Sequence, residues 1–405
     1  MSKLIVLTVA YNAAKTLRRA VDSILKQTYH NWTYYIIDNG SIDDTREIIA
    51  EYAQEDARIV QWNYDKNYVY RSYDIIQDIA RADAGDYLAI LDSDDEYKPS
   101  FLKDMLCFVQ EHNLDFATTG NEFISATDGS HLGNRAFSEH VICVETGFSY
   151  LEAYYGLLRP VWAKFFSLDI LRQIDYGYLY DIRYGADTAF CLDVAKRCDR
   201  FGILAGSYYK YYVNPKSDSY TYDPARFEAD RCLYKIARGF LLEKCGYVTA
   251  HNEEFLLLVY MNAIKDTLNV VLNARVPVDE KLSGVLGILS HEYTKQLAAK
   301  ENFGASFGDA MSSTKGRKDL FANVADWLLS LQEVPDGQVE SFCDMGEFAC
   351  AAAEHADGWV FFNKLRIRLL IDQGRAEEGR AKLGELEEVL PGDVDLAAFR
   401  AQLSQ

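Results

Sequence analysis

The sequence predicts an α/β N-terminal domain with a mostly parallel central sheet, followed by an all-α C-terminal domain. Two observations predict this fold class. As far as Val109, short apolar runs alternate with stretches whose apolar residues recur at helical spacing, a pattern typical of a parallel sheet covered by helices. From Asp223 onward, the strand-like runs stop and helical spacing continues. Because 405 residues exceed one ordinary core, we place the domains at residues 1–222 and 223–405.

The alternating region predicts four strands with helices between them. Each strand is short, apolar and rich in β-branched side chains, as expected for strands buried on both faces. They are expected at residues 3–9, 33–37, 58–62 and 87–91. Ser41 and Asp44 resemble a capping box that opens the second helix. The third helix is expected at residues 72–82, and another after Pro99, a residue that favours the first turn of a helix.

The C-terminal domain is expected to contain only helices. Residues 255–272 and 320–331 have helical apolar spacing. Residues 359–391 have the spacing of one tetratricopeptide-like helix pair. No second copy follows at that period, so a generic helical hairpin is expected rather than a repeat array.

The overall charge limits the classes of partner. The formal net charge is −19, from 61 acidic and 42 basic residues. A nucleic-acid-binding protein needs a basic face, and none stands out, so no nucleic-acid partner is expected. Net acidity also disfavours loose adhesion to anionic lipid. An anionic ligand must therefore be bound by positive charge at the site itself, such as a metal ion, a few cationic side chains or helix N-termini.

The chain is expected to be cytoplasmic. It has no run of about 18 apolar residues, so no transmembrane segment is expected, and the short apolar N-terminus is interpreted as a strand rather than a signal peptide. Eight cysteines form no CxxC pair, which favours reduced thiols. Peripheral contact with the inner face of the membrane, and homo-oligomers formed through the C-terminal helices, are compatible with this pattern.

Polar side chains follow three of the predicted strands at the point where each strand ends. These are Asn12, Asp38 and the segment Asp92-Ser93-Asp94. Because the carboxyl ends of parallel strands meet at one edge of a sheet, these side chains are expected to converge on one ligand site.

Asp92 and Asp94 are the candidate metal ligands. Their carboxylates suit Mg²⁺ or Mn²⁺, either of which can also bind substrate phosphates. A solvated acidic turn is the alternative, although the apolar strand before Asp92 favours a site. A calcium loop is excluded because Tyr97 stands where glycine is required. The glycine patterns of a dinucleotide fold and of a P-loop are absent from the sequence.

Five segments, taken together and in order, resemble glycosyltransferase family 2 over roughly residues 1–215. They are Thr8-Val9-Ala10-Tyr11-Asn12, Gln27-Thr28-Tyr29, Asp38-Asn39-Gly40-Ser41-Ile42-Asp43-Asp44-Thr45, Gly85-Asp86-Tyr87 and Leu91-Asp92-Ser93-Asp94-Asp95. The resemblance implies the GT-A fold (Rossmann-like, with a mostly parallel central sheet), nucleotide-diphosphate sugar donors and inversion at the anomeric carbon.

The resemblance also implies roles for individual residues. Tyr11 would line the base pocket, Asp38 would accept a hydrogen bond from uracil, and Asp94 would be the direct metal ligand, with Asp92 facing ribose and metal. Packing at the sheet end is the alternative for Tyr11, and a turn or cap role is the alternative for Asp38. The full set expected around the nucleotide sugar is Ala10, Tyr11, Asn12, Asp38, Asn67, Arg71, Asp92 and Ser93.

Asp187 is the candidate general base, the group that removes the proton from an acceptor hydroxyl. The family supplies this base from a Glu-Asp pair, and the matching segment here is Gly185-Ala186-Asp187-Thr188-Ala189-Phe190, in which alanine replaces the glutamate. The upstream segment Val161-Trp162-Ala163-Lys164-Phe165-Phe166 also resembles the family and supports this register. An N-cap of a helix at residues 188–196 is the alternative role for Asp187.

Two further departures concern the donor side. The family's Arg-Asn pair is replaced by Tyr73-Asp74, which leaves Arg71 and Lys66 as the nearby cations. The family's Tyr-Arg-His segment is replaced by Tyr211-Tyr212-Val213-Asn214-Pro215. Among many aromatic residues, Trp162 is singled out for its place beside the expected acceptor site.

The sequence therefore predicts a metal-dependent inverting glycosyltransferase that uses Mn²⁺ or Mg²⁺. Its donor would be a nucleotide-diphosphate sugar, with UDP expected. Its acceptor would be a hydroxyl of a glycan or lipid-linked glycan in bacterial surface polysaccharide synthesis. One alternative is a non-catalytic nucleotide-sugar-binding or scaffold protein. Another makes the C-terminal helices the main function, as a protein-interaction module.

Overall fold

A computed structural model describes residues 2–68, 72–182, 184–214, 222–304, 307, 314–335 and 337–404. Its internal contacts divide the chain into two compact units. The first unit comprises Met1–Ser219 and Arg231–Glu253, and the second comprises Tyr220–Asp230 and Glu254–Gln405. The domain boundary at 222/223 stays a prediction. The first helix after it, at Arg226–Cys245, belongs from Arg231 onward to the N-terminal unit.

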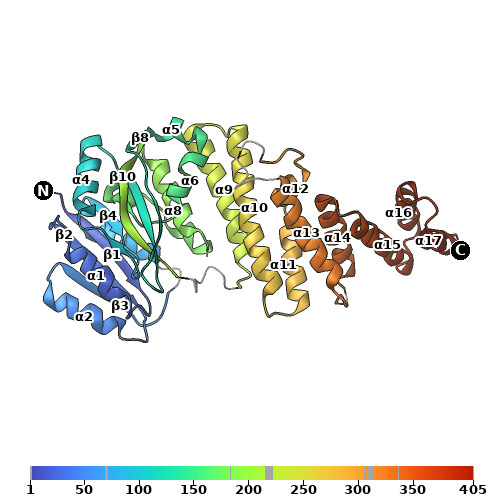
Figure 1. The fold of residues 1–405 in the computed structure, drawn as a ribbon, viewed down its shortest axis with the longest axis horizontal. Coiled ribbons are helices and arrows are strands. Elements are labelled where there is room, and N and C mark those ends of the chain that lie inside the picture. The colour runs from blue at the N-terminus through green and yellow to red at the C-terminus, as the bar shows by residue number, and fades with distance from the viewer. Residues whose placement is uncertain are drawn as a thin grey trace. The chain divides into compact units, whose positions relative to one another are not determined.

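The predicted alternation of strands and helices is present in the N-terminal unit (Figure 1). Its first elements are β1 (Leu4–Ala10), α1 (Leu17–Leu25), β2 (Trp32–Asn39), α2 (Thr45–Glu55), β3 (Ile59–Tyr64), α3 (Ser72–Ala82) and β4 (Tyr87–Ile90). The strands match the predicted ranges to within two residues at each end. β1, β2 and β4 are largely buried, as expected for strands covered on both faces, whereas β3 at the sheet edge is mostly half-buried.

The remaining elements of the unit continue the sheet and its helices. They are β5 (Glu96–Tyr97), α4 (Phe101–His112), β6 (Phe116–Ser125), β7 (His131–Arg135), β8 (His140–Cys143), α5 (Val144–Gly147), η1 (Phe148–Tyr150), α6 (Glu152–Leu158), β9 (Lys164–Ser167), α7 (Leu168–Leu171), η2 (Gly177–Asp181), α8 (Ala186–Arg197), β10 (Arg200–Val213) and α9 (Arg226–Cys245).

The sheet is mixed rather than mostly parallel. Its order is β3-β2-β1-β4-β9-β6-β10-β5, with β7 paired to β6 and β8 paired to β10. The four strands from β3 to β4 are parallel, as predicted. Beyond them, only the β6–β10 pair is parallel, because β9 enters the sheet antiparallel to both of its neighbours.

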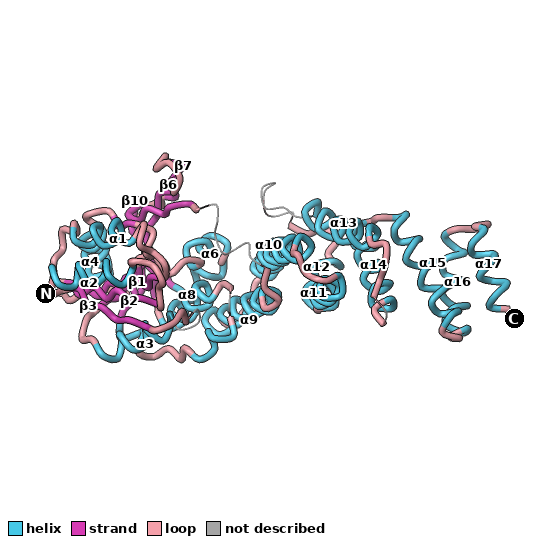
Figure 2. Tube along the Cα trace, turned by 90° about the horizontal axis from the view of Figure 1, so that it is seen from below, coloured by secondary structure: helices cyan, strands magenta, loops and turns pink. Residues whose placement is uncertain are grey.

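Helices cover both faces of this sheet. Apolar residues of α1, α2 and α4 share one core with the sheet face that carries Val6 and Ile36. α3 lies across the opposite face (Figure 2). This layering leaves the carboxyl ends of β1, β2 and β4 as the open edge.

The second unit is helical throughout its described residues, as expected. Its helices are α10 (Ala250–Asn273), which begins in the first unit, α11 (Val278–Ser290), α12 (Glu292–Ala299), α13 (Thr314–Ser330), α14 (Val339–Ala353), α15 (Ala356–Asp372), α16 (Ala376–Val389) and α17 (Val394–Leu403). α15 and α16 form the predicted hairpin, and each helix from α13 to α17 packs on the next. Ile367, Leu383 and Leu396 meet in a small core of the last three helices.

One helix, α10, is long and apolar enough to cross a membrane by length and composition alone. The apolar window is interrupted by charged residues such as Lys265, which is why no continuous apolar run appears in the sequence. Of that window, 56% is buried inside the protein, as in the core helix of a soluble protein.

Candidate functional site

The carboxyl ends of β1, β2 and β4 lie side by side, as the sequence predicts. Ala10 at the end of β1 is paired with Asp38 of β2, and Leu7 of β1 is paired with Ile90 of β4. The Thr8 hydroxyl donates to the carbonyl oxygen of Leu91 at 2.7 Å, which fixes the start of the acidic segment beside β1.

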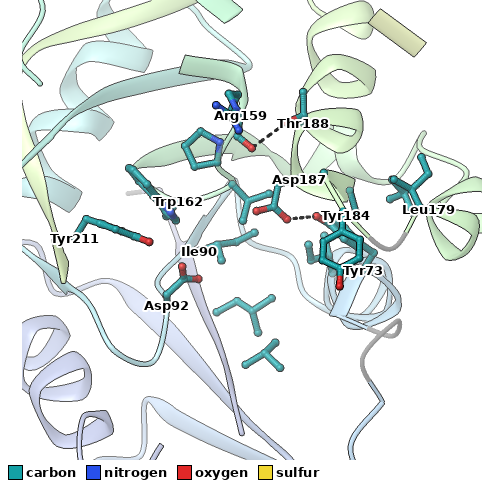
Figure 3. A pocket seen from close by; sticks show the side chains of 18 of the residues that line it. Tyr73, Ile90, Asp92, Arg159, Trp162, Leu179, Tyr184, Asp187, Thr188 and Tyr211 are labelled. Carbon is teal, nitrogen blue, oxygen red and sulfur yellow. Dashed lines mark hydrogen bonds between the residues drawn. The ribbon is translucent and has the colours of Figure 1, made fainter. Parts of the chain in front are cut away.

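A cavity of about 920 Å³ opens at this edge (Figure 3). It combines residues from the strand ends with residues more than one hundred positions later in the chain. Among the expected site residues, Tyr11, Asp92 and Asp187 line it. Further lining residues are Asn39, Tyr73, Phe123, Arg135, Arg159, Trp162, Tyr184, Ala186, Thr188 and Tyr211.

The Asp92 carboxylate faces this cavity (Figure 3). Its backbone N–H donates to the Tyr209 hydroxyl at 3.3 Å. None of the described residues donates a hydrogen bond to its carboxylate oxygens, so these oxygens remain available to a ligand. Burial, and then the charges of Asp95 and Asp187, raise the pKa of Asp92 well above its ordinary value. A cation at this position would relieve that electrostatic cost.

Asp95 has a structural role instead. Its carboxylate accepts hydrogen bonds from the Tyr209 hydroxyl and from the backbone N–H of Tyr212, each at 2.7 Å. Burial raises the pKa of Asp95 to about 7. These two hydrogen bonds fix the turn that presents Asp92 to the cavity.

Asp94 and Ser93 are partly buried and do not line the cavity. The Asp94 carbonyl oxygen accepts a hydrogen bond from Arg19, whose guanidinium lies 3.5 Å from the centre of the Tyr212 ring. Burial raises the pKa of the Asp94 carboxyl, and the charge of Arg19 opposes this shift. Within the described ranges, no group of three or more His, Cys, Asp or Glu side chains is arranged to hold a metal ion. Binding of Mg²⁺ or Mn²⁺ by Asp92 and Asp94 stays a prediction, and it would leave the remaining coordination positions to substrate or water.

Asp38 lies beside the cavity but not in it. Its side chain is fully buried, its Oδ2 pairs with Arg46 at 2.7 Å and its Oδ1 accepts the Ser41 N–H at 3.0 Å. The turn role that was the alternative for Asp38 is therefore present. Its contact with a nucleotide base stays a prediction.

The expected capping box before α2 is wrong. The N-cap is Asp44, and it makes no side-chain capping hydrogen bond. The Ser41 hydroxyl instead accepts the N–H of Asn12 at 3.0 Å, and Asp43 accepts the N–H of Thr45 at 3.1 Å. The polar residues of this loop thus join the ends of β1 and β2, an arrangement that local spacing does not reveal.

The remaining donor-side residues lie close to the cavity. Asn12 adopts a left-handed backbone with φ of 51°, and its Oδ1 accepts the N–H of Ile42 at 2.9 Å. Tyr11, 45% exposed, lies at the cavity lining next to it. Asn67 Oδ1 accepts a hydrogen bond from Asn39, a lining residue, at 3.0 Å. Arg71 lies outside the described residues.

Asp187 enters the cavity from the first turn of α8. The N-cap is Gly185, with φ of 78°, so the alternative N-cap role for Asp187 is wrong. The Tyr73 hydroxyl on α3 donates to Asp187 Oδ1 at 2.5 Å (Figure 3). Burial raises the pKa of Asp187, while the hydrogen bond from Tyr73 and the charge of Lys164 oppose the rise. Tyr73 was not assigned any role from the sequence.

Trp162 lines the cavity, and Lys164 is buried two residues after it. Trp162 stacks on Tyr209, with ring centres 4.5 Å apart. The fully buried Lys164 donates to the Trp162 carbonyl oxygen at 3.2 Å, and burial lowers the pKa of Lys164 to about 8. Ala163 between them has φ of 56°, a conformation that costs energy for a residue with a Cβ atom.

Comparison with known proteins identifies the class of this fold and site. Residues 5–149 match the family model described as glycosyl transferase family 2. Relatives include the putative teichuronic acid biosynthesis glycosyltransferase TuaG of Bacillus subtilis, 35% identical over 31% of this chain and 49% of its own length. The uncharacterized glycosyltransferase EpsJ of the same organism is 22% identical over 71% of this chain and 83% of its own length.

A third relative is a β-1,3-glucosyltransferase of Escherichia coli, WfgD, named for UDP-Glc and an α-D-GlcNAc-diphosphoundecaprenol acceptor. It is 28% identical over 29% of this chain and 44% of its own length. The match thus spans about half of TuaG and less than half of WfgD. Among solved structures, S. aureus TarS residues 1–349 are 14% identical, with a TM-score of 0.46, and the match covers 90% of this chain and 91% of that chain.

The N-terminal unit is therefore an α/β domain whose residues 5–149 are similar to glycosyltransferase family 2. This match supports the resemblance that the sequence motifs carry.

Proposed function

We propose that this protein is a metal-dependent inverting glycosyltransferase that moves a sugar from a nucleotide-diphosphate donor, with UDP as the expected nucleotide, to a hydroxyl of a glycan or lipid-linked glycan. The observation that carries the proposal is that Asp92, within the family 2 match at residues 5–149, and Asp187, 95 positions later in the sequence, line one cavity. The names of TuaG and WfgD support a role in bacterial surface polysaccharide synthesis.

The donor half of the mechanism uses the ends of β1, β2 and β4. Tyr11 offers an exposed ring on which a base can stack. Asp92 and Asp94 would hold the divalent ion, which, when bound, neutralises charge on the departing diphosphate. The free oxygens of Asp92, directed into the cavity, suit that role.

The acceptor half uses Asp187 as the base. An acceptor hydroxyl beside its carboxylate loses a proton to it while the hydroxyl oxygen forms a bond to the anomeric carbon. The bond between that carbon and the diphosphate oxygen breaks, and the nucleoside diphosphate leaves with the electron pair. Attack opposite the leaving group inverts the anomeric centre. The Tyr73 hydroxyl orients the base for this step.

Calorimetric titration with UDP and Mn²⁺, followed by an assay of UDP-sugar hydrolysis and transfer, tests the proposal. The variant Asp187→Asn keeps the size of the side chain but cannot accept a proton, so we expect UDP binding to persist and turnover to be lost. Binding with no turnover in the native protein would instead support the non-catalytic nucleotide-sugar-binding or scaffold alternative.

The role of the C-terminal helices belongs to the same proposal. We expect them to bind the acceptor, a partner protein or a second copy of the chain, on a cytoplasmic protein that contacts the inner face of the membrane peripherally. Removal of these helices after Asn273, a point that retains all of the N-terminal unit, would test this role. Full transfer to the native acceptor by such a truncated protein would contradict it.

A further inference from the structure

Two arginine side chains that line the cavity form no ion pair within the described residues. Arg135 at the end of β7 and Arg159 just after α6 both line it. Across the described ranges of the chain, neither guanidinium pairs with a carboxylate or donates a hydrogen bond. In a chain of net charge −19, two unpaired cations in one cavity call for a ligand explanation.

Other arginines of the same unit are neutralised by carboxylates. Arg18 pairs with Glu51, Arg46 with Asp38, Arg58 with Asp56, Arg172 with Asp169 and Arg197 with Asp193. Ion pairing is thus the commoner state of arginine among the described residues of this unit, although Arg81 and Arg200, which do not line the cavity, also form no ion pair.

The position of Arg159 places it on the acceptor side of the cavity. Its carbonyl oxygen accepts a hydrogen bond from the Thr188 hydroxyl at 3.4 Å, which ties it to the residue next to the base Asp187. In Figure 3, Arg159 and Asp92 lie on opposite sides of Trp162. Because the donor diphosphate is expected at Asp92, this placement favours the acceptor side of the cavity for Arg159.

Arg135 is oriented by an aromatic residue of the cavity. Its guanidinium carbon lies 5.8 Å from the centre of the Phe123 ring, and Phe123 also lines the cavity. The charge of Arg135 contributes to lowering the pKa of the buried Lys164, which shows that this charge acts on the cavity wall rather than only on bulk solvent. Repulsion among these cations would be relieved by a bound anion.

We propose that Arg135 and Arg159 form an anion-binding subsite that holds a phosphate or carboxylate group of the acceptor next to the hydroxyl deprotonated by Asp187. The inference rests on the proposed glycosyltransferase function and narrows its acceptor to an anionic one. The planar guanidinium suits either group because its parallel N–H donors match two oxygens of a phosphate or carboxylate. A neutral glycan would leave both cations unpaired.

Binding of defined probes to the full-length protein, in the presence of UDP and Mn²⁺, tests the subsite. The probes are a short glycerol-phosphate oligomer, an oligouronate and a neutral maltooligosaccharide of similar length. We expect the native protein to bind one of the two anionic probes and not the neutral one. The oligomer that binds distinguishes a phosphodiester from a carboxylate as the recognised group.

Variants assign this binding to the two arginines. Arg135→Gln and Arg159→Gln should each weaken binding of the anionic probe by about tenfold, the loss of one charge-assisted hydrogen bond. Arg81→Gln, an exposed arginine outside the cavity lining, is the matched control and should leave binding unchanged. Raised salt should weaken the anionic probe in the native protein more than in the two cavity variants.

Three outcomes would overturn the proposal. They are equal binding of neutral and anionic probes, no binding of either anionic probe, and weaker UDP affinity in the two variants, which would assign the arginines to the donor diphosphate. Failure of the native protein to bind UDP or hydrolyse any UDP-sugar is a different result. It would count against the proposed function and leave the anion-binding measurement interpretable by itself.

Discussion

Replacing Tyr73 by phenylalanine should raise the pH that the enzyme needs for catalysis. The Tyr73 hydroxyl donates to Asp187 Oδ1 at 2.5 Å, and this hydrogen bond holds down a pKa that burial raises. A hydrogen bond to a charged acceptor contributes about 1.5–3 kcal/mol, and partial exposure of Asp187 favours the lower end. At about 1.4 kcal/mol per unit, Tyr73→Phe should raise the pKa of Asp187 by about one unit.

The sign of the effect follows from the role of Asp187 as a base. Only the ionised carboxylate accepts the proton, so activity falls as pH drops through its pKa. The acidic limb of kcat/KM against pH should therefore move upward by about one unit in Tyr73→Phe, with near-native rates at high pH. Tyr178→Phe is the control. The Tyr178 hydroxyl donates to the Ala189 carbonyl of α8, the helix that carries Asp187, and not to Asp187 itself. An unmoved acidic limb in Tyr73→Phe, with UDP affinity intact, would refute the reasoning.

Three further substitutions test the site and the fold. Asp92→Asn removes a charged metal ligand, so it should weaken UDP binding measured with Mn²⁺ by about tenfold and leave metal-free binding unchanged. Equal UDP affinity of the variant and the native protein in Mn²⁺ would argue against metal at Asp92. Gly40→Ala should cost about 2 kcal/mol or more in chemical denaturation, because φ is 77° and an added Cβ would lie 2.3 Å from the Lys66 carbonyl carbon. Burial raises the pKa of Asp230 to about 6 from 3.8, so the folded state loses stability as pH rises from about 3.8 to about 6, and the full penalty is present above that range. Asp230→Asn, which can still accept the Thr267 hydroxyl, should stabilise by at most about 3 kcal/mol at pH near 7.5 and by less than about 1 kcal/mol near pH 4, as followed by the melting temperature. The same gain at both pH values would contradict the assignment.

The parallel half of the fold could be predicted because its signals are local. β1, β2 and β4 are buried on both sides, so each forms a continuous apolar run that is visible in the sequence. β6 and β10 mix polar and apolar residues, and β9 is only four residues long. The antiparallel insertion of β9 depends on tertiary pairing, which local patterns do not encode.

The same distinction applies to the site. The positions of the strand ends correctly placed Asp92 at the cavity, because parallel strands share an edge, whereas Asn12 and Asp38 lie beside the lining. Tyr11, expected there from the family resemblance, also lines the cavity. The contact between Tyr73 and Asp187 joins residues 114 positions apart and depends on how α3 packs beside α8. Arg135 and Arg159 likewise come from unrelated segments, so their pairing in the cavity appears only in the structure.

Alanine at position 186 reduces the family's usual Glu-Asp pair to one carboxylate, yet that carboxylate is not left without support. A second carboxylate would repel Asp187 and raise its pKa further, whereas the Tyr73 phenol donates a hydrogen bond that favours the ionised form. The buried ammonium of Lys164 also lowers the pKa of Asp187, through its charge. The Nζ atom of Lys164 donates its hydrogen bond to the Trp162 carbonyl oxygen rather than to Asp187. The base is thus kept usable by a neutral donor and a buried cation. This arrangement supports the proposal that a single aspartate acts as the base, and the pH profile of Tyr73→Phe tests that proposal most directly.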